Sequence, residues 1–271
     1  MAKISNEERH KYFEKIAVYK TAIETILARE QATLQLIKQD ASDAAFKRLA
    51  LAEDMLNLVS NYIIINGVSQ SVLKVKSEDS LNDGRKSLYK SVIYLEEVVS
   101  NYVDAPFSDY EDKIAAIESF DAASRYLLAR KMGLAIALLE NAYGDNTKWK
   151  WSFVELEGRY AAVVKNIMNL RMAVANTDPR SPNYEPTVYH LRLMKKLLMQ
   201  AADRYREKYE LSTSRIDDFK QGIFFLSALR RLHIVLGDRD EAEIVKKKLD
   251  IWTAKLESDL KKQEDSTQKK I

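Results

Sequence analysis

The chain contains no cysteine and very little glycine or proline. Its 271 residues include 7 Gly and 4 Pro. Without cysteine there are no disulfides, no thiol catalysis and no cysteine-bound metal. Turn-rich β folds need glycine and proline for the backbone angles of tight turns. Charged residues make up 31% of the chain and apolar residues 46%, a mixture typical of amphipathic helices. The composition therefore predicts an all-α fold of long antiparallel helices.

Long apolar runs and a strong charge of one sign are also missing. No run approaches the roughly 18 apolar residues of a membrane-spanning helix, and the opening MAKISNEERHKYFEK lacks the apolar segment of a signal peptide. We expect no membrane span and, by default, a cytoplasmic location; a periplasmic location stays open if a signal peptide has been removed. The net charge of +3 is too small to imply nucleic acid or an anionic membrane as a partner.

Motifs that carry catalysis are absent or incomplete. Glu7 and His10 have the E-x-x-H spacing of di-iron bundles, but His190 and His233 lack a glutamate three residues earlier. Residues 67–71 approach the G-x-S-x-G motif of hydrolases without its last glycine. No phosphate-binding or dinucleotide-binding loop occurs. We expect no enzymatic activity, no cofactor and no metal site.

Apolar residues recur at spacings of three and four along most of the chain, which is the helical period. Ser5 and Glu8 form a capping box for the first helix, Ser42 is expected to cap the second, and Asn66-Gly67 should disturb it. The expected helices cover residues 5–39, 42–75, 81–103, 109–131, a segment ending at 143, 148–176, 186–209, 214–236 and 238–262. We expect a long-helix bundle at 1–103, a second helical region at 108–262 and a disordered polar tail at 263–271.

The tetrad VSNY occurs at Val59–Tyr62 and again at Val99–Tyr102. The apolar residues around both copies have matching helical spacing, which favours two similar helices that face the core. This explanation predicts that both tyrosines are buried. A duplicated recognition element is the alternative.

Between about residues 108 and 262, two sets of residues match parts of a repeat pattern. They are Leu229, Gly237, Asp238 and Ala242 in one unit, and Tyr126, Ala135, Leu139 and Ala142 in another. On these residues, this part of the chain resembles tetratricopeptide repeats. No unit contains the full repeat pattern, so an ordinary helical bundle is the alternative. The resemblance implies stacked helices whose extended surface binds other proteins.

Two groups of residues are candidates for binding. Trp149 and Trp151 are two residues apart on one expected helix, so they point to different sides and at least one should be partly exposed. An exposed indole is either an anchor for a protein partner or a side chain lying over a neighbouring helix. A basic surface is formed by Arg192, Lys195, Lys196, Arg204 and Lys208. With the nearby tyrosines it suits single-stranded nucleic acid, but interspersed acids also fit an ordinary solvated helix face.

These features together predict a non-enzymatic adaptor or structural component that acts through contacts with other proteins or with itself. A large bacterial assembly, such as a motility or envelope structure, is one setting for it. The alternative is a nucleic-acid-associated helical protein that uses the basic surface at 192–209.

Overall fold

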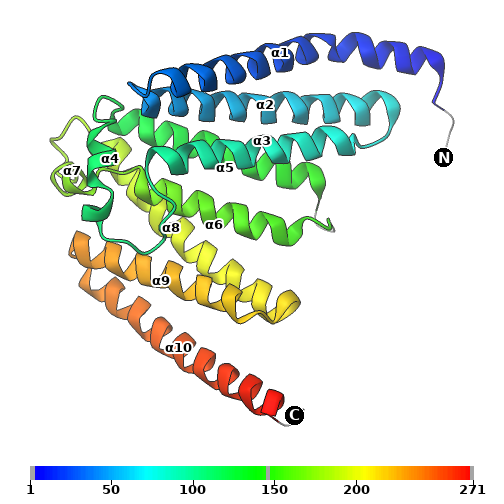
Figure 1. Cartoon of the computed structure of the whole chain (residues 1–271). Coiled ribbons are helices and arrows are strands. Elements are labelled where there is room, and N and C mark those ends of the chain that lie inside the picture. Colours follow the sequence, from blue (N-terminus) through cyan, green and yellow to red (C-terminus); the bar gives the residue numbers. More distant parts are fainter. Residues whose placement is uncertain (1–3, 145–146, 269–271) are drawn as a thin grey trace. The chain divides into compact units, whose positions relative to one another are not determined.

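The structure, a computed structural model, describes residues 4–144 and 147–268, and side chains as far as Lys262. Across these residues the chain forms ten α-helices, two short helices of other types and no strand (Figure 1). The prediction of an all-α fold is confirmed. Within the described ranges, no helix combines the length and the apolar character needed to cross a membrane.

The chain divides into two compact units. The first consists of residues 1–100 and 115–150, and the second of residues 101–114 and 151–271. The sequence predicts a single division, between residues 103 and 108. In the structure, residues 115–150 instead return to pack with the N-terminal helices.

The first unit contains four long helices. They are α1 (Asn6–Gln39), α2 (Ala44–Leu73), α3 (Glu78–Val98) and α5 (Ala122–Tyr143). Helices α1, α2 and α3 lie side by side in antiparallel succession (Figure 1), and α5 packs on α2 and α3. Large side chains that are almost fully buried form the core, among them Leu51, Met55, Leu58, Leu88 and Leu95. Their three-to-four spacing produces the buried faces of α2 and α3.

The start of α1 agrees with the capping prediction. The Glu8 backbone N–H donates to Ser5 Oγ at 3.2 Å, and the Ser5 N–H donates to Glu8 Oε2 at 2.8 Å. Farther along α1, the buried Glu30 carboxylate accepts hydrogen bonds from Lys90 Nζ at 2.9 Å and Tyr94 OH at 2.5 Å, both on α3. This polar contact ties α1 to α3 in addition to its apolar packing on α2.

The prediction for the start of α2 is wrong. Asp43, in the left-handed region at φ 54°, precedes the helix, and no side chain caps it. The Ser42 hydroxyl donates instead to the Asp40 carboxylate, which also accepts the Ser42 backbone N–H at 2.8 Å. The Ser42 side chain therefore belongs to the turn before α2 and does not cap the helix.

The expected disturbance at Asn66-Gly67 does not occur, because α2 continues unbroken to Leu73. The buried Asn66 side chain finds its partner outside the helix: its Oδ1 accepts the Ser77 N–H at 2.9 Å. Asn66 thus joins the end of α2 to the start of α3 and does not interrupt the backbone of α2.

The two VSNY copies differ in structure. Val59 and Val99 are both fully buried, whereas Tyr62 is half-buried and Tyr102 is 61% exposed. Helix α3 ends at Val98, so the second copy lies beyond the helix and cannot continue its stripe. The prediction that Tyr102 lies in the core is wrong.

The segment after α3 is more broken than expected. The predicted helix at 109–131 is replaced by η1 (Phe107–Asp109), α4 (Glu111–Ala115) and the start of α5. Asp121 caps α5 by accepting the Ser124 N–H at 2.7 Å. The predicted helix at 148–176 is two helices, α6 (Lys150–Asn166) and α7 (Leu170–Ala175), and the Asn169 side chain caps the second.

The second unit ends in a layer of three long helices. Helix α8 (Tyr184–Lys208) passes through a π-helical turn, η2 (Tyr209–Thr213), and is followed by α9 (Ile216–Leu236) and α10 (Arg239–Gln268). The three run in antiparallel succession (Figure 1). Helix α10 extends to Gln268 and not to about Lys262, and residues 269–271 of the predicted disordered tail lie outside the described residues.

Glycine allows the three C-terminal helices to approach closely. A Cβ atom on Gly222 of α9 would lie 3.0 Å from the Ala202 carbonyl oxygen of α8 and 3.2 Å from the Trp252 ring of α10. Contacts at these distances are tighter than ordinary van der Waals packing. Gly222 therefore sets the spacing of both neighbours from α9.

Candidate protein-contact surface

The turn between α9 and α10 is held by backbone and side-chain contacts. Gly237 ends α9 in the left-handed region at φ 78°, which favours glycine. The Asp238 carboxylate is hydrogen-bonded by Lys195 Nζ and by His233 Nδ1 at 3.1 Å. These contacts, that of Lys195 above all, lower the pKa of Asp238 below its usual value. The turn fixes α10 antiparallel to α9.

The inner face of α10 is anchored by one aromatic residue. Trp252 is 2% exposed, and its ring centroid lies 5.6 Å from that of Phe219 on α9. Two cations cover the indole: Arg206 Cζ lies 5.2 Å and Lys248 Nζ 5.0 Å from the ring centroid. Such cation–π contacts add to the large apolar area that a buried tryptophan contributes.

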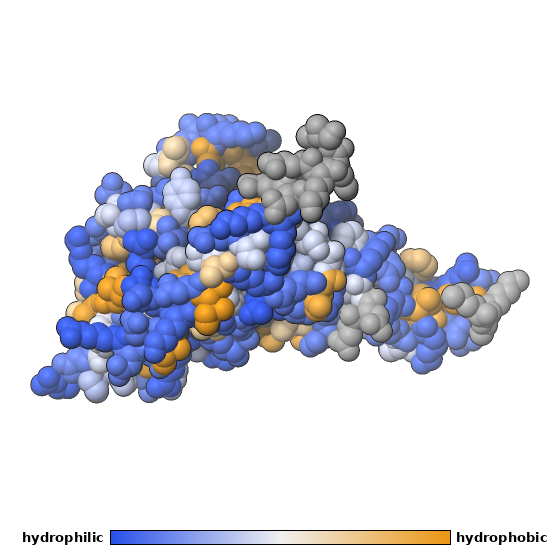
Figure 2. Space-filling model, turned by 90° about the horizontal axis from the view of Figure 1, so that it is seen from below, coloured by the Kyte–Doolittle hydropathy of each residue, from blue (hydrophilic) through white to orange (hydrophobic). Residues whose placement is uncertain are grey.

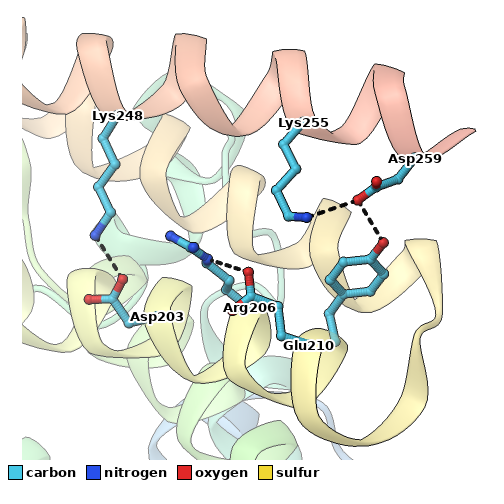
Figure 3. A network of polar contacts seen from close by, with 7 residues as sticks. Asp203, Arg206, Glu210, Lys248, Lys255 and Asp259 are labelled. Atoms are coloured by element: carbon cyan, nitrogen blue, oxygen red, sulfur yellow. Dashed lines mark hydrogen bonds and ion pairs between the residues drawn. The ribbon is translucent and has the colours of Figure 1, made fainter.

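Polar contacts border this anchor on the side of α10 that faces α8. Figure 3 shows Lys248 reaching down to Asp203, with Nζ 2.7 Å from Oδ1. The Asp259 carboxylate accepts hydrogen bonds from Lys255 Nζ at 3.1 Å and from Tyr209 OH at 2.9 Å. Hydrogen bonds from these two groups lower the pKa of Asp259. These polar side chains on the inner face of α10 thus have their partners within the same chain.

The outer face of α10 is different, because it exposes apolar side chains. Ile244 is 58% exposed and Ile251 is 68% exposed, and their separation of seven residues places them on one side of the helix. The face shown in Figure 2 is mostly hydrophilic, with apolar residues in separate patches. The terminal helix of a stacked array normally presents a polar outer face to water. The two exposed isoleucines in line make the outer face of α10 a candidate contact surface.

The predicted basic surface is largely neutralised within the second unit. Arg192 and Lys196 are exposed. The other three cations contact carboxylates, which are Asp238 for Lys195, Glu157 and Glu207 for Arg204, and Asp218 for Lys208. Each such carboxylate competes with a phosphate for the cation and repels the nucleic-acid backbone. These ion pairs favour the explanation that the basic residues form an ordinary solvated helix face.

Comparison with known proteins places the chain in a family. The model of the TP0443 family matches residues 8–260, which is most of the chain. The chain belongs to the TP0443 family. Searches of curated proteins and of solved structures found no match. Since the family name describes no activity, the function of this TP0443 family member must be argued from its own residues.

In this family member, both candidate tryptophans are half-buried. Trp149 lies against α3, where Arg85 Cζ is 3.9 Å from the ring centroid, and Lys148 Nζ is 5.3 Å away. This is the geometry of an indole that lies over a neighbouring helix. Trp151 is in the first turn of α6. A role for either tryptophan in binding a protein stays a prediction.

We expect the Trp149→Ala substitution to lower the stability of the first unit by about 2 kcal/mol, since it removes half-buried apolar area and the stacked guanidinium. Thermal unfolding followed by circular dichroism measures the effect, and Lys11→Ala in the same unit is the control because Lys11 is exposed. If Trp149→Ala left the melting temperature unchanged and abolished partner capture, Trp149 would be a contact residue.

A buried lysine lies elsewhere in the second unit of this family member. Lys165 on α6 is 5% exposed, and its Nζ lies 3.4 Å from Tyr110 OH and 5.1 Å from the Tyr110 ring centroid. Burial lowers the pKa of Lys165 to about 8, an effect that the nearby Asp104 carboxylate opposes. Among the described residues, no three acidic, histidine or cysteine side chains form a group suited to a metal ion.

Sequence reasoning missed Ile244 and Ile251. Their spacing was visible, but Val245 and Trp252 of the same helix are also seven residues apart. Only the structure shows which of the two stripes faces the chain itself: Val245 and Trp252 are buried, and the isoleucines are exposed.

Proposed function

We propose that this protein is a non-enzymatic adaptor or structural component that binds other polypeptides through the outer face of α10. The observation that carries the proposal is the pair of exposed isoleucines on a helix whose opposite face is fixed by Trp252. A rigid helix that presents apolar side chains in line needs little further ordering on binding, which lowers the entropic cost of association.

The likeness of the α9–α10 turn to a tetratricopeptide repeat supports the same class of function. Leu229 on α9 and Ala242 on α10, which carry part of the resemblance, are both buried. Stacked antiparallel helices of this kind offer extended surfaces for protein contacts. The setting that we propose is a larger bacterial assembly, such as a motility or envelope structure.

The test is capture of partners from the native host with the tagged full chain as bait. We expect Ile244→Lys combined with Ile251→Lys to lose the partners that the wild-type chain retains, because two lysines cannot enter an apolar contact without desolvation. Both positions are exposed, so the melting temperature should stay within about 1 °C of the wild type.

The matched control is Val18→Lys, at a site on α1 that is 66% exposed. This variant should keep the partners. If the double α10 variant captured the same proteins as the wild type, the outer face of α10 would not be the contact surface. A parallel salt titration with a single-stranded oligonucleotide checks the nucleic-acid alternative, which requires affinity that falls steeply with salt.

A further inference from the structure

The outer face of α10 carries two isoleucines seven residues apart, which is the heptad spacing. With Ile244 at position a, the following a positions are Ile251 and Ser258, and the d positions are Lys247, Ala254 and Lys261. All of these residues are exposed. In coiled coils the a and d positions form the contact seam between helices. In α10 the apolar part of this seam is Ile244, Ile251 and Ala254.

The residues on the two sides of this seam carry opposite charges in a strict order. Between residues 243 and 262, every g position is acidic and every e position is a lysine. The g positions are Glu243, Asp250 and Glu257, and the e positions are Lys248, Lys255 and Lys262. The three acids are exposed. In a parallel pair, each g residue meets the e residue five positions later on the partner.

This order makes α10 complementary to itself. In a parallel pair, Glu243 meets Lys248 of the second copy, Asp250 meets Lys255, and Glu257 meets Lys262. We propose that the protein forms a two-fold dimer in which α10 pairs with α10 of a second copy in parallel and in register. This inference rests on the proposed function, since it names the partner of the same surface.

The antiparallel arrangement is disfavoured by the same charges. There, g residues would meet g residues and e residues would meet e residues, so acids would face acids and lysines would face lysines. Like charges opposite each other are destabilising. The charge order therefore selects the parallel orientation as well as the partner.

The three e-position lysines already contact carboxylates of their own chain, but each can also contact an acid of the second copy. Lys248 contacts Asp203, Lys255 contacts Asp259, and Lys262, which has a side chain 74% exposed, lies 3.5 Å from Asp259. An ammonium group has three N–H donors, so each can hold its internal acceptor and one acid of the second copy.

The seam has only two large apolar residues per chain, and lysine occupies two d positions. A single short helix pair also buries less than the roughly 1,600 Å² of a standard interface. The dimer is therefore weak, and its population depends on protein concentration.

The test is sedimentation of the full chain over a concentration series, with charge exchange at one pair. Glu257→Lys places lysines opposite each other at 257 and 262, and Lys262→Glu places acids opposite each other, so each variant alone should dimerise about tenfold more weakly. The two variants mixed, and the double variant Glu257→Lys with Lys262→Glu, should both recover wild-type association.

Three outcomes would overturn the proposal: a wild-type chain that stays monomeric throughout the series, single variants that dimerise like the wild type, or a mixture that does not recover association. Failure here would leave the proposed function intact if the α10 variants still lost partners other than a second copy. If those variants lost no partner at all, the proposed function would fail as well.

Orientation is tested by single cysteines, because the chain contains none of its own. In a parallel dimer every a or d residue faces itself, so Ala254→Cys and Ser258→Cys should each form a disulfide between two copies under mild oxidation. Thr253→Cys, exposed and outside the seam, is the control and should not. Cross-linking at 253 equal to that at 254 and 258, or none at 254 and 258, would overturn the parallel register.

Discussion

Replacing Trp252 with alanine should lower the free energy of unfolding of the second unit by about 3–5 kcal/mol, the range of large aromatic truncations in cores. Trp252 is 2% exposed and contacts Phe219, Arg206 and Lys248. Its loss leaves a cavity on the inner face of α10. The two covering cations also lose the ring on which they lie.

Urea unfolding followed by circular dichroism measures this loss. Thr253→Ala is the matched control on the same helix: its side chain is exposed and lies outside the seam, so the cost should stay within about 0.5 kcal/mol. Equal destabilisation by the two substitutions would mean that α10 does not pack through Trp252 as described.

The second large effect is stabilising. We expect Lys165→Met to raise the free energy of unfolding at pH 7 by about 2–3 kcal/mol, because the substitution removes a charge that burial disfavours. The pKa of Lys165 is lowered to about 8 from the ordinary lysine value of 10.5, and each pKa unit corresponds to about 1.4 kcal/mol.

The lowered pKa of Lys165 also determines whether the stability of the protein rises or falls with pH. Above pH 8 the folded chain releases the Lys165 proton while the unfolded chain still holds it, so wild-type stability should rise from about pH 8 to pH 9.5. The rise should be absent in Lys165→Met and present in Lys196→Met, at an exposed site. A wild-type stability that is flat or falls over this interval would contradict a buried, charged Lys165.

The long helices could be predicted because their signals are local. The Ser5–Glu8 capping box and the apolar stripe of α1 need no tertiary information, and neither does Gly237 at the end of α9. The predicted helix at 109–131 failed at its start, because residues 107–109 form a short 3-10 turn, η1. The cap of α5 is provided by Asp121, whose pairing with Ser124 has the spacing of many turns.

The candidate site was predictable only in part, since exposure depends on which helix covers which. Trp149 was a candidate because one of two tryptophans so close in sequence should be exposed, but Arg85 of α3 covers its ring. Arg204 and Lys208 were candidates because they belong to a cluster of cations. Their carboxylate partners Glu157 and Asp218 lie 47 and 10 residues away in the sequence. Pairings over such distances follow from the packing of the helices and cannot be inferred from the spacing along the chain.

The glycine at position 222 has a mechanical consequence for the C-terminal layer. Its missing side chain lets the Ala202 carbonyl and the Trp252 ring both rest against the same point of α9. The Lys248–Asp203 contact also joins α10 to α8, so a force on α10 is passed to two helices at once. We therefore expect α8, α9 and α10 to move together under load.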